Sequence, residues 1–419
     1  MRRVVATGIG FITSIGNDRD AVRESLRELR HGIEFHPSFR SDRIPIKLAG
    51  TIKGFETEAT GYEKWTFPDR YKVPRTVLRS LAPHGIYAYC ALDQAIEDAG
   101  LTGDEVSNDR TGMHTASGGS PSRIYRSLNI MHQRGVQKCS PMWLISSIPG
   151  TLNFNLAAAF AIKGSSCGFV SACSSSGHAL GHAFDEIVSG RQDRMIVVGG
   201  EDGDMEGILP FASMRALSTC ADPDRASRPF DCARDGFVGT GGAAAMILEE
   251  IDTARRRNAH VYAEYLGWGQ GSDGYHVAKS HPEGAGLVSA IGCALRATGV
   301  SSDQVDYVNA HATSTLPGDR SELLALNNIF GDNGKGPAIS STKALTGHGL
   351  SLASIMEASF SLLAIRDGFM PGSAHIENLD PAAGNLRIIR ETVDEAPKTI
   401  LSNSSGFGGT NVALIFRAI

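Results

Sequence analysis

The sequence lacks both a disulfide framework and a membrane span. Its seven cysteines are widely scattered and include no CxxC pair, so neither a disulfide scaffold nor a zinc ribbon is expected. No run of about 18 uninterrupted apolar residues occurs, and no small-residue cleavage site follows the apolar start MRRVVATGIGFITSIG. We interpret that start as a first strand, and we expect a protein of the reducing cytoplasm with no membrane partner.

An excess of positive charge is also absent. The 40 Lys and Arg residues stand against 45 Asp and Glu, a net charge of −5, so we expect no nucleic-acid partner. A dinucleotide fingerprint is incomplete as well, because Thr13 stands where a third glycine would follow Gly8 and Gly10. A hydrophobic content of 42% is ordinary for a globular protein.

What the sequence does have is length and internal order. Its 419 residues allow two domains or one large duplicated unit. The pattern G-L-x-x-D-x-V at 100–106 returns as G-V-x-x-D-x-V at 299–305, each time between a predicted helix and a predicted strand. We expect a layered α/β architecture in two halves, residues 1–254 and 255–419.

The remaining elements follow from hydrophobic periodicity. A helix is predicted from a cap at Asn17 to Gly32, and a helix over 352–365 is apolar nearly all round, which is typical of a buried helix. Residues 33–80 are predicted to be an irregular surface excursion, and residues 202–240 an ordered loop excursion. Other helices are predicted over 86–99 and 286–298, and strands over 4–7, 110–117, 193–199, 243–249, 261–266 and 307–310.

Residues 168–190 predict a helix that begins at a cysteine. Apolar residues recur at half-buried helical spacing from Leu180 to Val188, and Gly190 predicts the end. At the predicted start, unpaired backbone N–H groups and the helix dipole would favour the thiolate of Cys173. Taken alone, such a residue is more often an ordinary buried cysteine. We expect Cys167, six residues earlier, to pack inside the preceding strand.

Four places in the second half complement Cys173. They are NAHATST at 309–315, STKALTGH at 341–348, Glu357 in the predicted buried helix, and NSSGFGGTN at 403–411. Each has an ordinary explanation, because lone histidines are usually structural, lysines are usually solvated and GFGG is usually a turn. Their combination in one chain favours a catalytic site.

In these motifs the sequence resembles the β-ketoacyl-acyl-carrier-protein synthases, the discrete type I and type II condensing enzymes of bacterial fatty-acid synthesis. The resemblance runs from VVATGIGFITSIGN near the start to NSSGFGGTNVALIF near the end. It includes SAC at 171–173, HATST, KALTGH, ALST at 216–219 and RDGFV at 234–238. It implies a duplicated thiolase fold of five layers, αβαβα, usually assembled as a homodimer.

The resemblance also implies residue roles. Cys173 would take an acyl chain from a carrier protein as a thioester, and His311 and His348 would act on the malonyl thioester. Lys343 and Glu357 would form a charged pair that orders the site. Phe407 would be a gating aromatic. Substrate-binding positions would be Thr313 and Thr315, which would contact the phosphopantetheine arm, together with Ser405, Gly406 and Gly408.

The implied reaction is a decarboxylative Claisen condensation that adds two carbons from malonyl-carrier protein. Loss of CO2 leaves an enolate, and imidazole N–H donors would stabilise its oxygen by about 2.7–4 kcal/mol each. Backbone N–H groups of Cys173 and Phe407 could hold the later oxyanion, because the glycines beside Phe407 allow a close approach. The covalent intermediate divides one hard step into two, and no metal or redox cofactor is expected.

Four basic residues match places where relatives contact an acidic carrier protein: Arg75, Arg79, Arg134 and Lys138. Ordinary solvated surface is the open alternative. Under the first interpretation they steer the carrier protein by charge complementarity.

Two alternative functions stay open at this point. A non-elongating partner subunit of a heterodimeric synthase usually loses the nucleophile, which is present here. A thiolase that uses coenzyme A needs a second catalytic cysteine near the C-terminus, whereas Cys293 is the last in this chain.

Several small residues depart from the family pattern. Ser405 stands where a second Phe is usual, Ala312 replaces a Gly, Ser351 and Ser354 interrupt a glycine-rich run, and residues 174–176 are all serine. No catalytic group is lost, but the expected acyl pocket and gate change. We hypothesise that the acyl chain is bulkier, functionalised or polyunsaturated rather than simply saturated.

Overall fold

The computed structural model describes residues 2–57, 61–331 and 336–419. In the first half, five strands form a sheet in the order β5-β4-β6-β7-β1. The parallel pairs are β5-β4 and β4-β6, whereas β6-β7 and β7-β1 are antiparallel. Their bounds are β1 (Val4–Ile12), β4 (Thr111–Ala116), β5 (Ser166–Phe169), β6 (Arg194–Glu201) and β7 (Gly242–Glu250).

The second half repeats this sheet. Its order is β10-β9-β12-β13-β8, in which two parallel pairs are again followed by two antiparallel pairs. Strand β11 (Arg387–Ile388) extends the sheet at the β10 edge. Three residue pairs between β1 and β8 join the two halves. The bounds are β8 (Ala263–Ser272), β9 (Tyr307–Asn309), β10 (Ala338–Ser340), β12 (Thr399–Gly406) and β13 (Thr410–Arg417).

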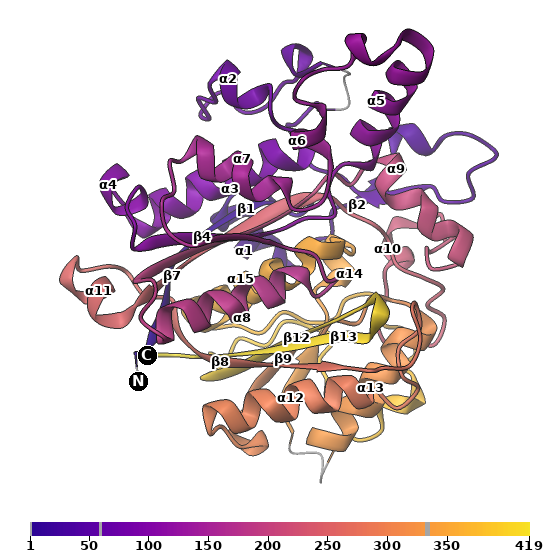
Figure 1. The fold of residues 1–419 in the computed structure, drawn as a ribbon. Coiled ribbons are helices and arrows are strands. Elements are labelled where there is room, and N and C mark those ends of the chain that lie inside the picture. The colour runs from indigo at the N-terminus through magenta and orange to yellow at the C-terminus, as the bar shows by residue number, and fades with distance from the viewer. Residues whose placement is uncertain (1, 58–60, 332–335) are drawn as a thin grey trace.

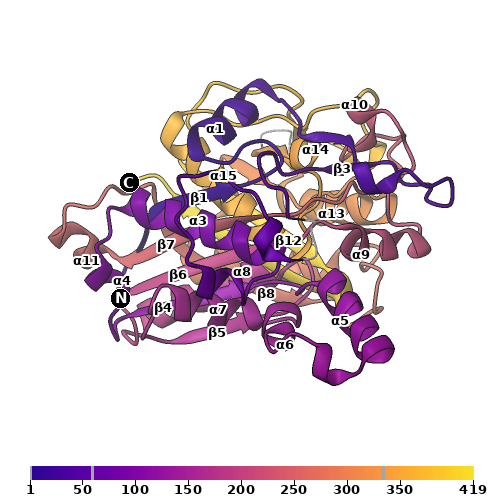
Figure 2. The ribbon, with the colours of Figure 1, turned by 90° about the horizontal axis from the view of Figure 1, so that it is seen from above.

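The helices complete five layers (Figure 1). Helices α8 (Ser175–Val188) and α15 (Ala353–Asp367) lie between the two sheets, and Figure 2 shows the same packing from above. The outer face of the first sheet carries α3 (Pro83–Ala99) and α7 (Thr151–Ala159), and that of the second carries α12 (Ala285–Thr298) and α13 (Leu316–Phe330). The αβαβα prediction is confirmed.

The repeated sequence pattern marks equivalent corners of the two halves. Gly100 and Gly299 end α3 and α12 in the left-handed region, with φ of 65° and 69°. A capping box follows in each half, built by Thr102 with Glu105 and by Ser301 with Gln304. A division of the chain after residue 254 stays a prediction.

Helix α15 is buried on every side. Each residue from Ala353 to Ile365 is buried, as expected for a helix packed between two sheets. Among them is the carboxylate of Glu357, which is fully buried and therefore requires a partner. This buried helix thus carries one of the expected site residues.

The excursions contain more structure than expected. Residues 33–80 hold β2 (Ile33–Phe35), β3 (Leu48–Gly50) and α2 (Arg75–Leu78). Outside the predicted excursions, 117–150 hold α5 (Pro121–Arg134) and α6 (Trp143–Ser147). Shorter helices are α4 (Gly103–Val106), α9 (Met205–Ile208), α10 (Pro223–Ala226), α11 (Ile251–Arg256) and α14 (Lys343–Thr346). Within the described ranges, no helix is both long and apolar enough to cross a bilayer.

Two local expectations were wrong. Asp18, not Asn17, caps α1 (Arg19–Glu28), because its carboxylate accepts from the Ala21 N–H. Cys167 is exposed rather than packed, because β5 is the outermost strand of its sheet and one of its sides is open.

Candidate active site

Cys173 lies in the short connection between β5 and α8, not in the first turn of the helix. Helix α8 begins at Ser175, with Ser174 at its N-cap. Ala172 has φ of 52°, and this left-handed residue turns the chain sharply before the cysteine. The Ser174 hydroxyl donates to the carbonyl of Thr410 (2.7 Å). The nucleophile position is therefore fixed against β13 of the other half.

The expected depression of the thiol pKa was wrong. Burial raises the pKa of Cys173 to about 12, and nearby Lys343 and the N–H groups of Phe407 and Cys173 only partly offset it. Desolvation outweighs the helix terminus because the cysteine precedes the first turn. Cys173 is therefore held as a thiol, and the two N–H groups expected to form an oxyanion hole face its sulfur.

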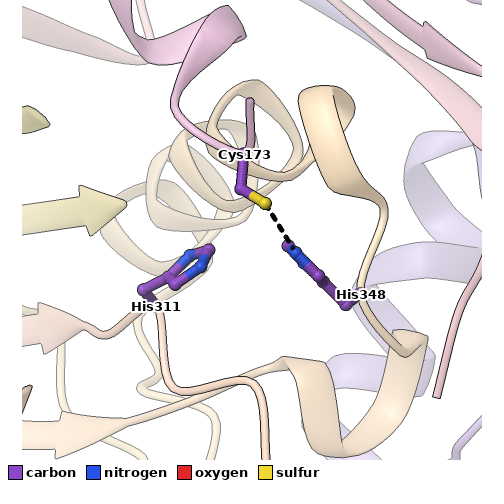
Figure 3. Close-up of side chains that lie close together, drawn as sticks. All are labelled: Cys173, His311 and His348. Carbon is purple, nitrogen blue, oxygen red and sulfur yellow. Dashed lines mark hydrogen bonds between the residues drawn. The ribbon is translucent and has the colours of Figure 1, made fainter. Parts of the chain in front are cut away.

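Two histidines converge on this sulfur (Figure 3). His348 Nε2 lies 3.1 Å from Cys173 Sγ, and one side-chain nitrogen of each histidine and the sulfur all lie within 4.8 Å of one another. The rings are nearly perpendicular, at 86°, with centroids 5.2 Å apart. The motifs at 309–315 and 341–348, distant in sequence, thus meet at Cys173.

Both imidazoles are neutral. Burial, with the positive charge of Lys343, holds the pKa of His311 and of His348 well below the usual range. Each Nδ1 is buried without a hydrogen-bond partner among the described residues, so we assign the proton to Nε2. His348 therefore directs its Nε2–H at the Cys173 sulfur, and a ring nitrogen of His311 lies in the same cluster.

The backbone around each histidine is anchored. Glu322 accepts from the N–H groups of His311 (2.8 Å) and Ala312 (2.6 Å). The His348 N–H donates to the carbonyl of Val238 (2.7 Å). These bonds hold the backbone of both histidines in place, so the N–H donors of their rings are preorganised.

Lys343 and Glu357 form a fully buried ion pair between α14 and α15. Burial raises the pKa of Glu357 to about 7, against the opposing charge of Lys343. A buried pair of this kind is costly to break, because the remaining charge has no partner. The expected charged pair is thus present behind the two histidines.

The glycine-rich loop places Phe407 over the site. Phe407 is 37% exposed and packs against Phe211 at a centroid distance of 5.9 Å. A Cβ on Gly406 would stand 3.0 Å from the Cys173 nitrogen, so only glycine allows this approach. Gly408 has φ of 80°, which favours glycine for conformational reasons.

A cavity of about 540 Å³ opens onto these groups. Cys173, His311 and His348 lie on its wall, together with Phe407, Thr313, Thr315, Ser405 and Gly406. Gly408, Lys343 and Glu357 do not line it. The two threonine hydroxyls lie 3.1 Å apart, and the Ser405 hydroxyl donates to Asn411 (2.6 Å).

The four basic residues expected to contact a carrier protein lie away from this cavity. Arg75 and Arg79 lie at α2, and Arg134 and Lys138 lie at the end of α5 and just beyond it. All four are exposed, and none lines the cavity. Its lining instead includes two exposed cations that sequence reasoning missed, Arg215 and Lys279.

Sequence reasoning also missed buried acids that support the site. Glu322 holds the backbone of His311 at the end of β9. Asp319 accepts from the Ser314 N–H (3.1 Å) and pairs with Arg234 (3.3 Å). Both acids lie on α13, which hydrophobic periodicity did not predict. Their position shortly after HATST was the available signal.

Comparison with known proteins decides the family. Residues 1–254 match the N-terminal domain of beta-ketoacyl synthase, and residues 262–377 match its C-terminal domain. The chain belongs to the β-ketoacyl synthase family. Membership confirms the recognised family and the predicted class, an acyl-transferring condensing enzyme.

Relatives of this family match the whole chain. The chain is 40% identical to 3-oxoacyl-[acyl-carrier-protein] synthase 1 of Haemophilus influenzae, covering 100% of this chain and 99% of that protein. Identity to the Escherichia coli K12 protein of the same name is 38%, with 100% of both chains covered. A solved beta-ketoacyl synthase from Burkholderia phymatum superimposes with a TM-score of 0.91 at 31% identity, covering 100% of both chains.

Proposed function

We propose that this protein is a β-ketoacyl-acyl-carrier-protein synthase of fatty-acid or related polyketide or polyene synthesis. The convergence of the Cys173 sulfur and two neutral imidazoles on one cavity carries the proposal. Relatives named 3-oxoacyl-[acyl-carrier-protein] synthase, at 34–40% identity across the chain, support it.

The first half-reaction loads the acyl chain. The Cys173 sulfur attacks the thioester carbonyl of an acyl-carrier protein, and the thiol proton ends on the departing carrier thiol. The oxyanion formed on the way sits toward the N–H groups of Cys173 and Phe407, which face this sulfur. The thioester bond breaks at the carrier sulfur and forms at Cys173.

The second half-reaction builds the carbon–carbon bond. The malonyl thioester oxygen accepts from the Nε2–H groups of His311 and His348, so the charge that develops as CO2 leaves has donors in place. The carbanion attacks the acyl carbonyl on Cys173, and the sulfur departs and takes a proton from the medium. The products are a β-ketoacyl-carrier thioester and CO2.

These steps are acyl transfer, decarboxylation and proton transfer, so we propose no metal or redox cofactor; phosphopantetheine enters on the carrier. Thr313 and Thr315, on the cavity wall, are the proposed contacts of that arm. The seven free thiols fit a reducing, cytoplasmic setting. A partner-subunit role and a thiolase role are disfavoured, because the nucleophile is intact and no cysteine follows Cys293.

We also propose a homodimer built on the open edge of β5. Around this strand lie exposed apolar side chains on the β5–α8 connection and on α6–α7: Leu144, Ile148, Phe154 and Val170. An unpaired strand edge beside an apolar patch is typical of an interface. Light scattering should give a dimer mass, and V170D should shift it toward monomer; a wild-type monomer would contradict this assembly.

Mass spectrometry tests the reaction. Incubation with acyl-carrier protein should add one acyl group to the peptide that contains Cys173, and C173A should carry none. Addition of malonyl-carrier protein should then release a β-ketoacyl-carrier product with loss of CO2. An enzyme that makes this product without an adduct on Cys173 would refute the mechanism.

A further inference from the structure

Glu201 is a buried acid that the reaction above does not use. It is the last residue of β6 and is 6% exposed. Its Oε1 accepts from the N–H of Gly118 (3.0 Å), from the N–H of Ser351 (3.3 Å) and from the Ser351 hydroxyl. One carboxyl oxygen thus receives three donors.

These donors connect Glu201 to the catalytic histidine. Ser351 lies three residues after His348, in the 3-10 turn Leu350–Leu352 that leads into α15. On the other side, a Cβ at Gly118 would stand 3.2 Å from Glu201 Oε1, so the carboxyl packs directly on that glycine. Glu201 therefore ties the turn after His348 to the end of β6 and the residues after β4.

We propose that Glu201 is a positioning residue that holds the turn carrying His348. This inference rests on the proposed condensation, because His348 acts there on the malonyl thioester.

Two variants test this role. E201Q keeps an oxygen acceptor for Gly118 and Ser351, whereas S351A removes the hydroxyl that donates to Glu201. Asp204→Asn is the matched control, because Asp204 is a half-buried carboxyl three residues further on, and Asn can replace it as the N-cap of α9.

Malonyl-carrier decarboxylation reports the positioning effect. S351A should lower its kcat about 10-fold, while the rate of acyl loading on Cys173 stays within about twofold of wild type. E201Q, which keeps the acceptor, and the control Asp204→Asn should both stay close to wild type. Equal kcat for S351A and wild type would overturn the positioning role, whereas a wild-type protein that never loads an acyl group would overturn the proposed function instead.

Discussion

Ser405 shows how a single small side chain can set substrate choice. It lies on β12 and points its hydroxyl to Asn411, which in turn donates to Asp273 (3.0 Å). These three residues line the same cavity as the nucleophile. A larger residue at 405 would occupy cavity space and displace this polar wall.

S405F should therefore discriminate against bulky acyl chains. We expect kcat/KM for long or branched acyl-carrier substrates to fall at least about 10-fold, while the value for a short saturated chain changes little. S405A, which removes only the hydroxyl, serves as the size control. A uniform loss for chains of every length would contradict a specificity role for this position.

The sequence predicted the site residues that stand in recognisable motifs. It did not predict the residues that reach the site only because the fold buries them there. Cys173, His311 and His348 stand in short motifs at strand ends, and the structure brings them together. Glu201 and Glu322 could not be found in this way, because an isolated acid gives no sign that folding will bury it beside a catalytic backbone. The pKa of Cys173 was misjudged for the same reason, since burial is a property of the fold.

At the scale of elements, helix α8 depends on glycine for its position. A Cβ on Gly181 would stand 2.2 Å from the ring of Trp268 on β8, so the helix that follows Cys173 touches the second sheet directly. The half-buried spacing from Leu180 to Val188 predicted this helix, but its start is two residues later than expected. Residues 171–174 are small and non-helical. An isolated bridge between Ser171 and Cys173 and the hydrogen bond from Ser174 to Thr410 hold them in place.

G181A should destabilise the fold. Overpacking at this contact is expected to lower the free energy of unfolding by about 1–3 kcal/mol, measured by urea denaturation. G103A is the matched control, because no atom lies within 4 Å of a Cβ at that helical position, and alanine favours helix over glycine. Equal unfolding midpoints for the two variants would refute the packing argument.

Elements without a clear period escaped prediction. Helix α13 buries polar residues such as Asp319, Ser321 and Glu322 beside its apolar ones, so its buried face does not read as an apolar stripe. Strands β10 and β11 have three and two residues, too few to show alternation. Long buried elements such as α15 were predicted because their composition alone marks them.

Helix α2 gives the carrier-docking hypothesis a test. We propose that Arg75 and Arg79, exposed on and next to α2, attract an acidic carrier protein. R75E/R79E should raise KM for acyl-carrier protein about 10-fold at low salt with little change in kcat, because charge acts mainly on encounter. The control R387E/R390E reverses two exposed arginines near β11; an equal effect on KM would point to net charge rather than to docking.

At the scale of the whole molecule, two sets of buried groups respond to pH in opposite directions. Burial raises the pKa of several carboxyl groups, to about 6 for Asp204 and Asp319 and about 7 for Glu201, Glu322 and Glu357. Burial lowers the pKa of several histidines, among them His114 (to about 4), His178, His311 and His348. Both sets link protons to folding.

The carboxyl groups bind protons in the native state that the unfolded chain releases near pH 4.5, so their contribution falls as pH rises toward about 7. The histidines stay neutral in the native state but are protonated in the unfolded chain below about pH 6.5, so their contribution rises up to that pH. Above it, the histidines with lowered pKa contribute no further gain, while the carboxyl contribution still decreases. Stability should therefore reach a maximum near pH 6.5, and the urea midpoint at fixed protein concentration should be lower at pH 8.

E322Q should flatten this decrease, because it removes one titrating group while keeping an acceptor for the His311 N–H. A urea midpoint that keeps rising to pH 8 would show that the buried carboxyls are ionised throughout.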